Sequence, residues 1–140
     1  MKNSKILFFL SILLLGGAAG LLVYDRLDPG QKEASAEPSI DDVIETSVDI
    51  GEIATNLLDQ RYVKISFMVQ TDGKKAKSEL EKRKFQAQNI IITELSDMKA
   101  EDLEGKKGKQ SLEELIKVRM NEEMQQGKVV KVYITSYIIS

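Results

Sequence analysis

The sequence contains no cysteine, no histidine and no tryptophan, and only two prolines among its 140 residues. Without cysteine there is no disulfide framework, no thiolate nucleophile, no zinc ribbon and no site for a lipid-modified cysteine. Without histidine, the usual donors of a catalytic zinc site and the base of a Ser-His-Asp relay are missing as well. An oxygen-ligated metal site, or an enzyme that uses carboxylates or lysine, remains open. Composition therefore disfavours catalysis, and we expect no catalytic residue, no metal site and no cofactor.

Charged residues make up 30% of the chain and apolar ones 42%, a balance typical of a globular protein. The exception is the segment 6–24, bounded by Ile6 and Tyr24, which contains no charge. As a helix it would rise roughly 28 Å, about the thickness of the hydrocarbon layer of a membrane. Lys2 and Lys5 precede it, so the positive-inside rule keeps residues 1–5 in the cytoplasm. The sequence predicts a single transmembrane helix whose C-terminal side is extracytoplasmic.

A cleaved signal peptide is the alternative interpretation of this segment. Residues 6–15 would be its apolar core and residues 18–20 a cleavage site made of small residues. The apolar run resumes at residues 21–23, however, so cleavage there would leave an apolar new terminus. An uncleaved anchor is therefore favoured.

Gly16 and Gly20, inside the same segment, have the GxxxG spacing that lets two membrane helices pack closely. Small residues are also frequent in membrane helices that do not pair. We keep the two glycines as candidate helix-packing residues.

The segment 25–39 contains both prolines, several small polar residues and almost nothing apolar. Acidic residues outnumber basic ones in it, so it is expected to be a flexible acidic linker. Residues 40–140 then form an extracytoplasmic domain. At the start of that domain, residues 43–53 predict a first strand. The signal is weak because acids interrupt the apolar pattern.

The rest of the domain has clearer periodicity. Strict alternation at residues 61–71 and a β-branched, aromatic-rich run at residues 129–139 predict two further strands. Apolar spacings of three, four or seven predict a helix over residues 74–98. A second helix is expected to open at Ser111, with Glu114 completing a capping box, and to stop at Gly127. Two helices packed on a small antiparallel or mixed sheet make an α+β fold.

The last strand is apolar on both faces, which would be an aggregation hazard at an exposed edge. It is therefore expected to be central in the sheet or covered by a second subunit. Simple alternation places Tyr133 and Tyr137 together on the outward face, where they are a candidate assembly surface, although cross-strand aromatic pairing is their ordinary use. The inward face would then hold Val130, Val132, Ile134 and Ile138.

Three further clusters have ordinary explanations. The basic cluster in residues 74–84 could meet an acidic partner, but such clusters are commonly solvated helix faces. Residues 105–109 lack the glycine spacing and the hydroxyl of a phosphate-binding loop. The acids in residues 101–104 lack the spacing of a calcium-binding EF-hand. None of the three forms a recognisable catalytic constellation.

The order of these features resembles the family of the flagellar basal-body-associated protein FliL. The similarity covers nearly the whole chain: a basic N-terminus, one membrane span, an acidic tether and a domain of about a hundred residues. More specific marks are the strand opening at residues 61–64 (RYVK), the helix at 80–83 (LEKR), the DLEG at 102–105 followed by GK at 108–109, and the ending 132–137 (VYITSY) close to Ser140. The proline-tyrosine entry to the first strand that is common in the family is not evident here.

The resemblance implies a non-catalytic accessory protein of the bacterial flagellar motor, at the cell membrane beside the ion-conducting stator units. Family members are thought to form rings outside the membrane, with a fold similar to the stomatin and prohibitin domain, and to help hold stators active under load. The implied partners are the stator proteins and the basal body, further copies of the chain, and membrane lipid through the N-terminal helix. No nucleic acid is expected.

Two alternatives come from other classes of protein. A secreted binding module unrelated to the flagellum would have a mature N-terminus near Leu21. A carboxylate-based hydrolase would need two acids that converge in a pocket.

Overall fold

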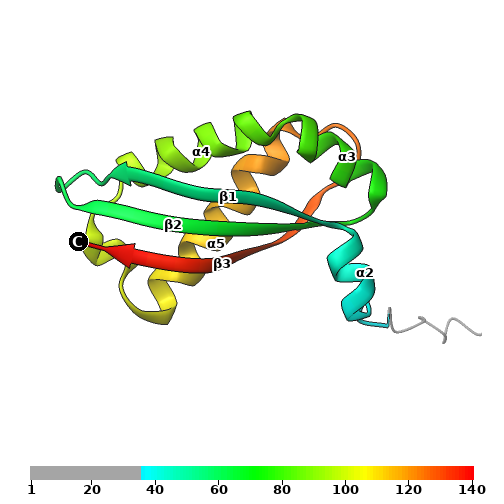
Figure 1. Cartoon of the computed structure of the whole chain (residues 1–140), viewed down its shortest axis with the longest axis horizontal. Coiled ribbons are helices and arrows are strands. Elements are labelled where there is room, and N and C mark those ends of the chain that lie inside the picture. Colours follow the sequence, from blue (N-terminus) through cyan, green and yellow to red (C-terminus); the bar gives the residue numbers. More distant parts are fainter. Residues whose placement is uncertain (1–35) are drawn as a thin grey trace, which may run out of the picture. The chain divides into compact units, whose positions relative to one another are not determined.

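A three-stranded antiparallel sheet with the order β1-β2-β3 carries the fold of residues 36–140, the part of the chain that the computed structural model describes (Figure 1). The central strand is β2, because both β1 and β3 pair with it. On β2 the alternate residues Val63, Ile65, Phe67 and Val69 are all fully buried, so a single face of the sheet forms the core. The strand bounds are β1, Ser47–Asn56; β2, Tyr62–Thr71; and β3, Val129–Ile139.

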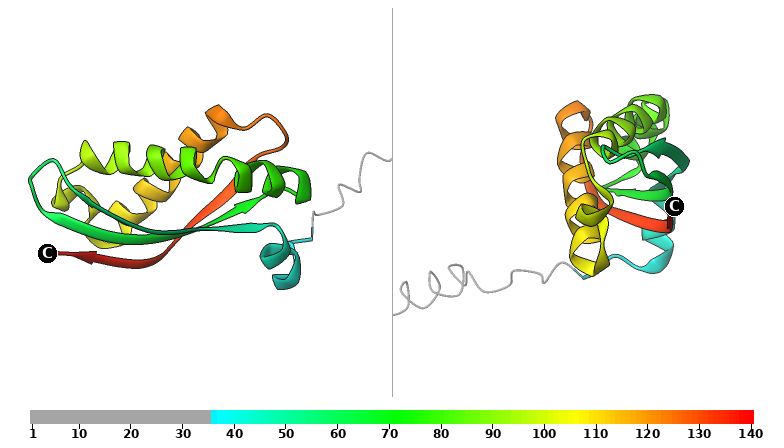
Figure 2. Two further views of the ribbon diagram at one scale, coloured as in Figure 1. Left: turned by 45° about the horizontal axis from the view of Figure 1, so that its top comes forward. Right: turned by 90° about the vertical axis from the view of Figure 1, so that its left-hand side faces the viewer.

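Helices cover that buried face. α4 packs along β1 and α5 along β3, and Figure 2 shows both on the same side of the sheet. No described helix lies across the middle of the opposite face, which we call the open face. The helix bounds are α2, Ile40–Glu45; α3, Lys74–Lys82; α4, Lys84–Ser96; the 3-10 helix η1, Ala100–Leu103; and α5, Gly105–Glu123.

The core is a single apolar cluster between the sheet and these helices. Burying one large aliphatic or aromatic side chain stabilises a fold by about 1.5–3 kcal/mol, so this cluster is the main source of stability. The expected α+β class, with a small antiparallel sheet, is confirmed. The helical contribution comes from Leu80, Ala87, Ile91, Leu95, Leu112, Ile116 and Met120.

The strand expected at residues 43–53 is wrong in its first part, because residues 40–45 form the short helix α2. Ser39 caps this helix: its hydroxyl accepts from the Asp42 N–H at 3.2 Å, and its own N–H donates to the Asp42 carboxylate at 3.1 Å. This reciprocal capping box favours a helix start over an extended chain. β1 then begins at Ser47 and runs three residues past the expected end.

The helix expected over residues 74–98 is divided in two at Arg83, whose ψ of 8° departs from helical geometry. Arg83 is both the C-cap of α3 and the N-cap of α4. Its side chain is held by Glu79 and Gln86, one from each helix. A kink at this point lets α3 lie over the end of β1 and β2 while α4 follows β1.

The second helix begins at Gly105 and not at Ser111, so the predicted capping box is wrong. The two glycines before Ser111 suggested a loop, but Gly108 lies within the helix for a tertiary reason. A β-carbon there would come within 2.6 Å of the backbone of Asp102 and Leu103. Glycine is therefore required where α5 crosses η1.

The predicted stop at Gly127 is late by several residues, since α5 ends at Glu123. Gly127 has a φ of +88° and lies in the loop that leads into β3. A β-carbon at this glycine would also collide with Asp72 and Ala76. The residue thus serves a tight turn beside α3, and it does not terminate the helix.

The bounds of β3 are those predicted, but the strand is at the edge of the sheet and its faces are not the predicted ones. Two register shifts leave Val130 and Thr135 as extra residues, so strict alternation fails. Tyr137 pairs with Ile65 and Ile134 with Phe67, which places both on the helix-covered face. The helix-covered face of β3 consists of Val129, Val132, Ile134, Tyr137 and Ile139.

The predicted transmembrane segment with Ile6, Tyr24, Gly16 and Gly20 lies outside the described residues, as does most of the predicted linker 25–39. Among residues 36–140, no helix has the length and apolar character needed to span a bilayer. The proposed likeness to the stomatin and prohibitin domain stays a prediction.

Candidate interaction surfaces

Acidic side chains in the described domain are mostly engaged by neighbouring groups. Within residues 36–140 no three metal-ligating side chains converge on a common point. Glu113 and Glu114 line a hollow of about 220 Å³ between α5 and β3. However, Glu113 accepts the backbone N–H of Ile134 at 3.0 Å, and Glu114 pairs with Lys117 at 2.7 Å. The two acids therefore act as structural partners in this hollow.

The outer edge of β3 is covered along its first half by side chains of α5. Asn121 donates to the carbonyl of Val129 at 2.9 Å and accepts its N–H at 2.8 Å, and Glu113 binds Ile134. These bonds satisfy backbone groups that an edge strand would otherwise leave available to another chain.

The second half of β3 has a different edge. Tyr62 and Ser140 exchange two backbone hydrogen bonds of 3.0 Å each, so the antiparallel pattern turns the backbone groups of Tyr137 and Ile139 outward. An edge with free N–H and C=O groups can accept an added strand. This half of β3 is therefore a candidate interaction edge.

Tyr133 and Tyr137 lie on opposite faces of the sheet, so the structure does not bring the two predicted assembly residues together. Tyr133 is on the open face, where its hydroxyl donates to Gln70 at 2.9 Å. Tyr137 is on the covered face, where its hydroxyl donates to the carbonyl of Leu103 at 3.3 Å. Burial, and then the negative charge of Glu104, raise the pKa of Tyr137 above its ordinary value.

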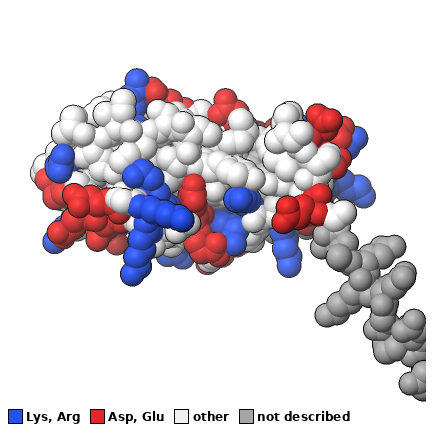
Figure 3. Space-filling model, turned by 90° about the horizontal axis from the view of Figure 1, so that it is seen from below, with Lys and Arg blue, Asp and Glu red and all other residues white. Residues whose placement is uncertain are grey.

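The open face combines apolar and charged side chains: Asp49, Glu52, Lys64 and Lys131 lie on it, and Lys64 pairs with Glu52 at 3.0 Å. Ile138 is 58% exposed on it, beside Lys64 of β2, and Met68 lies between Asp49 and Tyr133. Figure 3 views the domain from below and shows charged side chains gathered along one side, with the other side largely uncharged. An uncovered sheet face with this composition is a second candidate interaction surface.

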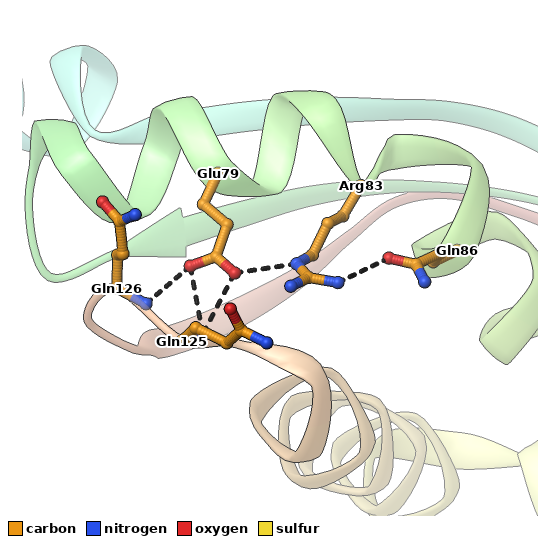
Figure 4. A network of polar contacts seen from close by, with 5 residues as sticks. All are labelled: Glu79, Arg83, Gln86, Gln125 and Gln126. Atoms are coloured by element: carbon orange, nitrogen blue, oxygen red, sulfur yellow. Dashed lines mark hydrogen bonds and ion pairs between the residues drawn. The ribbon is translucent and has the colours of Figure 1, made fainter.

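A polar clasp joins α3 to the loop before β3 (Figure 4). The carboxylate of Glu79 accepts the backbone N–H of Gln125 at 3.0 Å and that of Gln126 at 2.6 Å. It also accepts the guanidinium Nε of Arg83 at 2.7 Å, and Arg83 in turn donates to Gln86 at 2.9 Å. One carboxylate thus connects α3, the start of α4 and a loop more than forty residues away.

The environment of Glu79 has opposing effects on its pKa. Desolvation raises the pKa, but the bonds from Arg83 and from the two backbone N–H groups outweigh it, so the net shift is downward. The charged form is therefore favoured in the folded protein. The i, i+4 spacing of Glu79 and Arg83 was visible in the sequence, whereas the loop donors were not.

About half of the predicted basic cluster is engaged inside the domain. Lys74 pairs with Glu45 at 2.7 Å, Lys77 donates to the carbonyl of Glu45 at 3.0 Å, and Arg83 belongs to the clasp. These contacts tie α3 to α2 and to the loop before β3. The other three basic residues of the cluster are exposed, as expected for a solvated helix face: Lys75, Lys82 and Lys84.

The family of the chain follows from comparison with known proteins. The family described as "Flagellar basal body-associated protein FliL" matches residues 47–139, from the start of β1 to the end of β3. The chain belongs to the FliL family. It is also 40% identical over 121 residues to "Flagellar protein FliL" of Bacillus subtilis (strain 168), covering 86% of each chain. The resemblance inferred from the sequence is confirmed, and the family is one of flagellar basal-body proteins, not of known enzymes.

The clasp yields a prediction about pH. Replacing Glu79 with Gln should lower the melting temperature at pH 7, because the loop N–H groups and Arg83 lose a charged acceptor. The lowered pKa of Glu79 means that its stabilising effect is present above the unfolded pKa of about 4.3 and is lost as pH falls through the folded value. Thermal melts from pH 7 to pH 3 should show the two proteins converging at the acid end.

Glu81→Gln is the matched control, since Glu81 is exposed on the same helix. It should melt like the unmodified protein at every pH. A Glu79→Gln melting curve that stays parallel to the unmodified one down to pH 3 would contradict the assigned role of the carboxylate.

Proposed function

We propose that this FliL-family protein is a non-catalytic accessory component of the bacterial flagellar basal body that associates with stator units and supports motor torque. The observation that carries the proposal is the family match, which covers every strand of the sheet and the helices α3 to α5. The engaged state of Glu79, Glu113 and Glu114 agrees with a structural use of these acids.

The proposal includes a single-pass anchor at residues 6–24, with the N-terminus in the cytoplasm and the domain outside. Its support is the uncharged sequence of that segment and the two lysines before it. The stretch shared with the Bacillus subtilis relative is longer than the match at 47–139, so the likeness extends upstream of the domain. Tethering raises the effective concentration of the domain near a membrane partner, to the millimolar range for short flexible linkers.

Self-association is the second part of the proposal. The outward edge at Tyr137 and Ile139 can extend the sheet, and the open face offers apolar area around Ile138. A second copy that covers these groups would remove the hazard of an exposed edge strand. The proposed subunit contact therefore uses the open face and the second half of β3.

The anchor is expected to be necessary for function beyond export. A strain in which residues 1–24 are replaced by a cleavable signal peptide should release a folded domain and should not regain full swimming speed, because the domain is no longer concentrated at the membrane. Swimming speed and the amount of extracytoplasmic protein are measured together.

The matched control replaces residues 6–24 by another uncharged single-span helix of equal length, which should restore swimming. Full rescue by the released domain, at the same protein level, would refute the anchored function.

The subunit contact can be tested at Ile138. Ile138→Asp should leave the melting temperature unchanged, since the side chain is 58% exposed, but should reduce self-association by placing a charge in the contact. Light scattering of residues 36–140, at concentrations where the unmodified domain associates, gives the readout.

Val118→Asp is the control, because Val118 is 48% exposed on α5, away from the open face. If both variants associate like the unmodified domain, or if both dissociate equally, the contact lies elsewhere.

A further inference from the structure

The short helix α2 exposes two large apolar side chains. Ile40 is 70% exposed and Ile44 is 64% exposed, whereas Val43 between them is half-buried against the domain. Residues four apart on a helix lie on the same side, so the two isoleucines form one apolar pair that points away from the core. An exposed apolar pair of this kind is a candidate contact surface.

Hydrogen bonds attach the C-terminal end of α2 to the domain. A six-residue helix is not stable alone, and its neighbours supply the support. The carbonyl of Glu45 accepts from Lys77, and the carbonyl of Thr46 accepts both the N–H of Thr71 at 3.0 Å and its hydroxyl at 2.8 Å. These bonds connect the end of α2 to α3 and β2.

α2 is the first described element after the predicted linker, so the proposed membrane anchor is its neighbour along the chain. Only the linker 25–39 separates it from the proposed membrane anchor, and a flexible chain of that length spans roughly 20 Å. α2 and the start of α3 lie at one end of the domain, and Figure 1 shows the β1–β2 turn and the C-terminus at the other. The apolar pair is therefore at the end of the domain to which the predicted linker is attached.

The charges near the pair are compatible with a lipid surface. α2 contains Asp41, Asp42 and Glu45, but Asp42 is used in the capping box with Ser39 and Glu45 is paired with Lys74. The hydrogen bonds from Ser39 lower the pKa of Asp42, so it keeps its charge in that role. In the first turn of α3, Lys74 and Lys77 are engaged by Glu45, whereas Lys75 is exposed and can meet an anionic headgroup.

We propose that α2 is an interfacial docking element, with Ile40 and Ile44 inserted at the boundary between headgroups and acyl chains and the exposed Lys75 of α3 beside the lipid phosphates. The proposal rests on the anchor described above, which supplies the proximity. Two isoleucines give weak binding by themselves, but the tether makes the contact intramolecular and so raises its occupancy. Docking would fix the orientation of the domain and direct the β1–β2 turn and the C-terminus away from the membrane.

The absence of tryptophan from the chain allows a direct test. The full-length Ile44→Trp variant, reconstituted into vesicles of phosphatidylcholine with phosphatidylglycerol, contains a single indole on α2. We expect its emission to be shifted to the blue and to lose intensity when the lipid acyl chains are brominated near the headgroup. The matched control is Leu58→Trp: Leu58 is 52% exposed in the β1–β2 turn, and its indole should show neither effect.

Each outcome decides one of the two proposals. Quenching of the Ile44→Trp variant alone supports docking. If both variants float with the vesicles but neither is quenched, the domain stands away from the bilayer, and the docking proposal is wrong while the anchor is retained. A blue shift without quenching would mean that protein covers the pair, which also overturns lipid docking. If the full chain does not float with vesicles at all, the anchor itself is wrong and docking fails with it.

Discussion

The burial of one face of β2 is the constraint on which the rest of the structure depends. Val63, Ile65, Phe67 and Val69 are fully buried on one side of the central strand, so every core helix must cover that side. A sheet of three strands has two edges and a second face, and α4 and α5 lie on the first face only. The open face and the second half of β3 are thus available for contacts because of how the core is built.

Polar side chains bind backbone N–H and C=O groups that the apolar core leaves without partners. Asn121 and Glu113 protect the first half of the β3 edge, and Glu79 holds the loop that precedes it. The same residues are acids and amides that an enzyme could have used, but here their oxygens accept backbone N–H groups. This use of the acids agrees with the proposed non-catalytic role, for which the candidate interaction surfaces are on the strands.

The local sequence pattern was sufficient to predict an element where one of its faces is buried without interruption. The alternation in β2 and the β-branched run of β3 predicted both strands and their bounds closely, and the order of motifs predicted the family. It failed where a distant group decides the geometry. Gly108 suggested a loop because its close contact with η1 is not visible in the sequence, and the Glu79 carboxylate that holds Arg83 is itself bound by the distant N–H groups of Gln125 and Gln126.

The candidate site shows the same limit. The extra residues Val130 and Thr135 change which side chains of β3 share a face, and a shift of one residue reverses the assignment of every side chain beyond it. Alternation alone therefore grouped Tyr137 with Tyr133, although Tyr137 contacts η1 and Tyr133 contacts Gln70. Ile138 replaces Tyr137 as the exposed residue of the open face, a change that only the register reveals.

The central proposal is that the protein supports the motor under load while anchored at the membrane. A clean deletion of its gene, with the full chain restored from a second locus as the control, should be scored for swimming speed in media of rising viscosity. The account predicts a deletion strain that still assembles filaments but slows more steeply than its parent as viscosity rises, with full recovery in the restored strain. A deletion strain that swims like its parent at every viscosity would contradict the account.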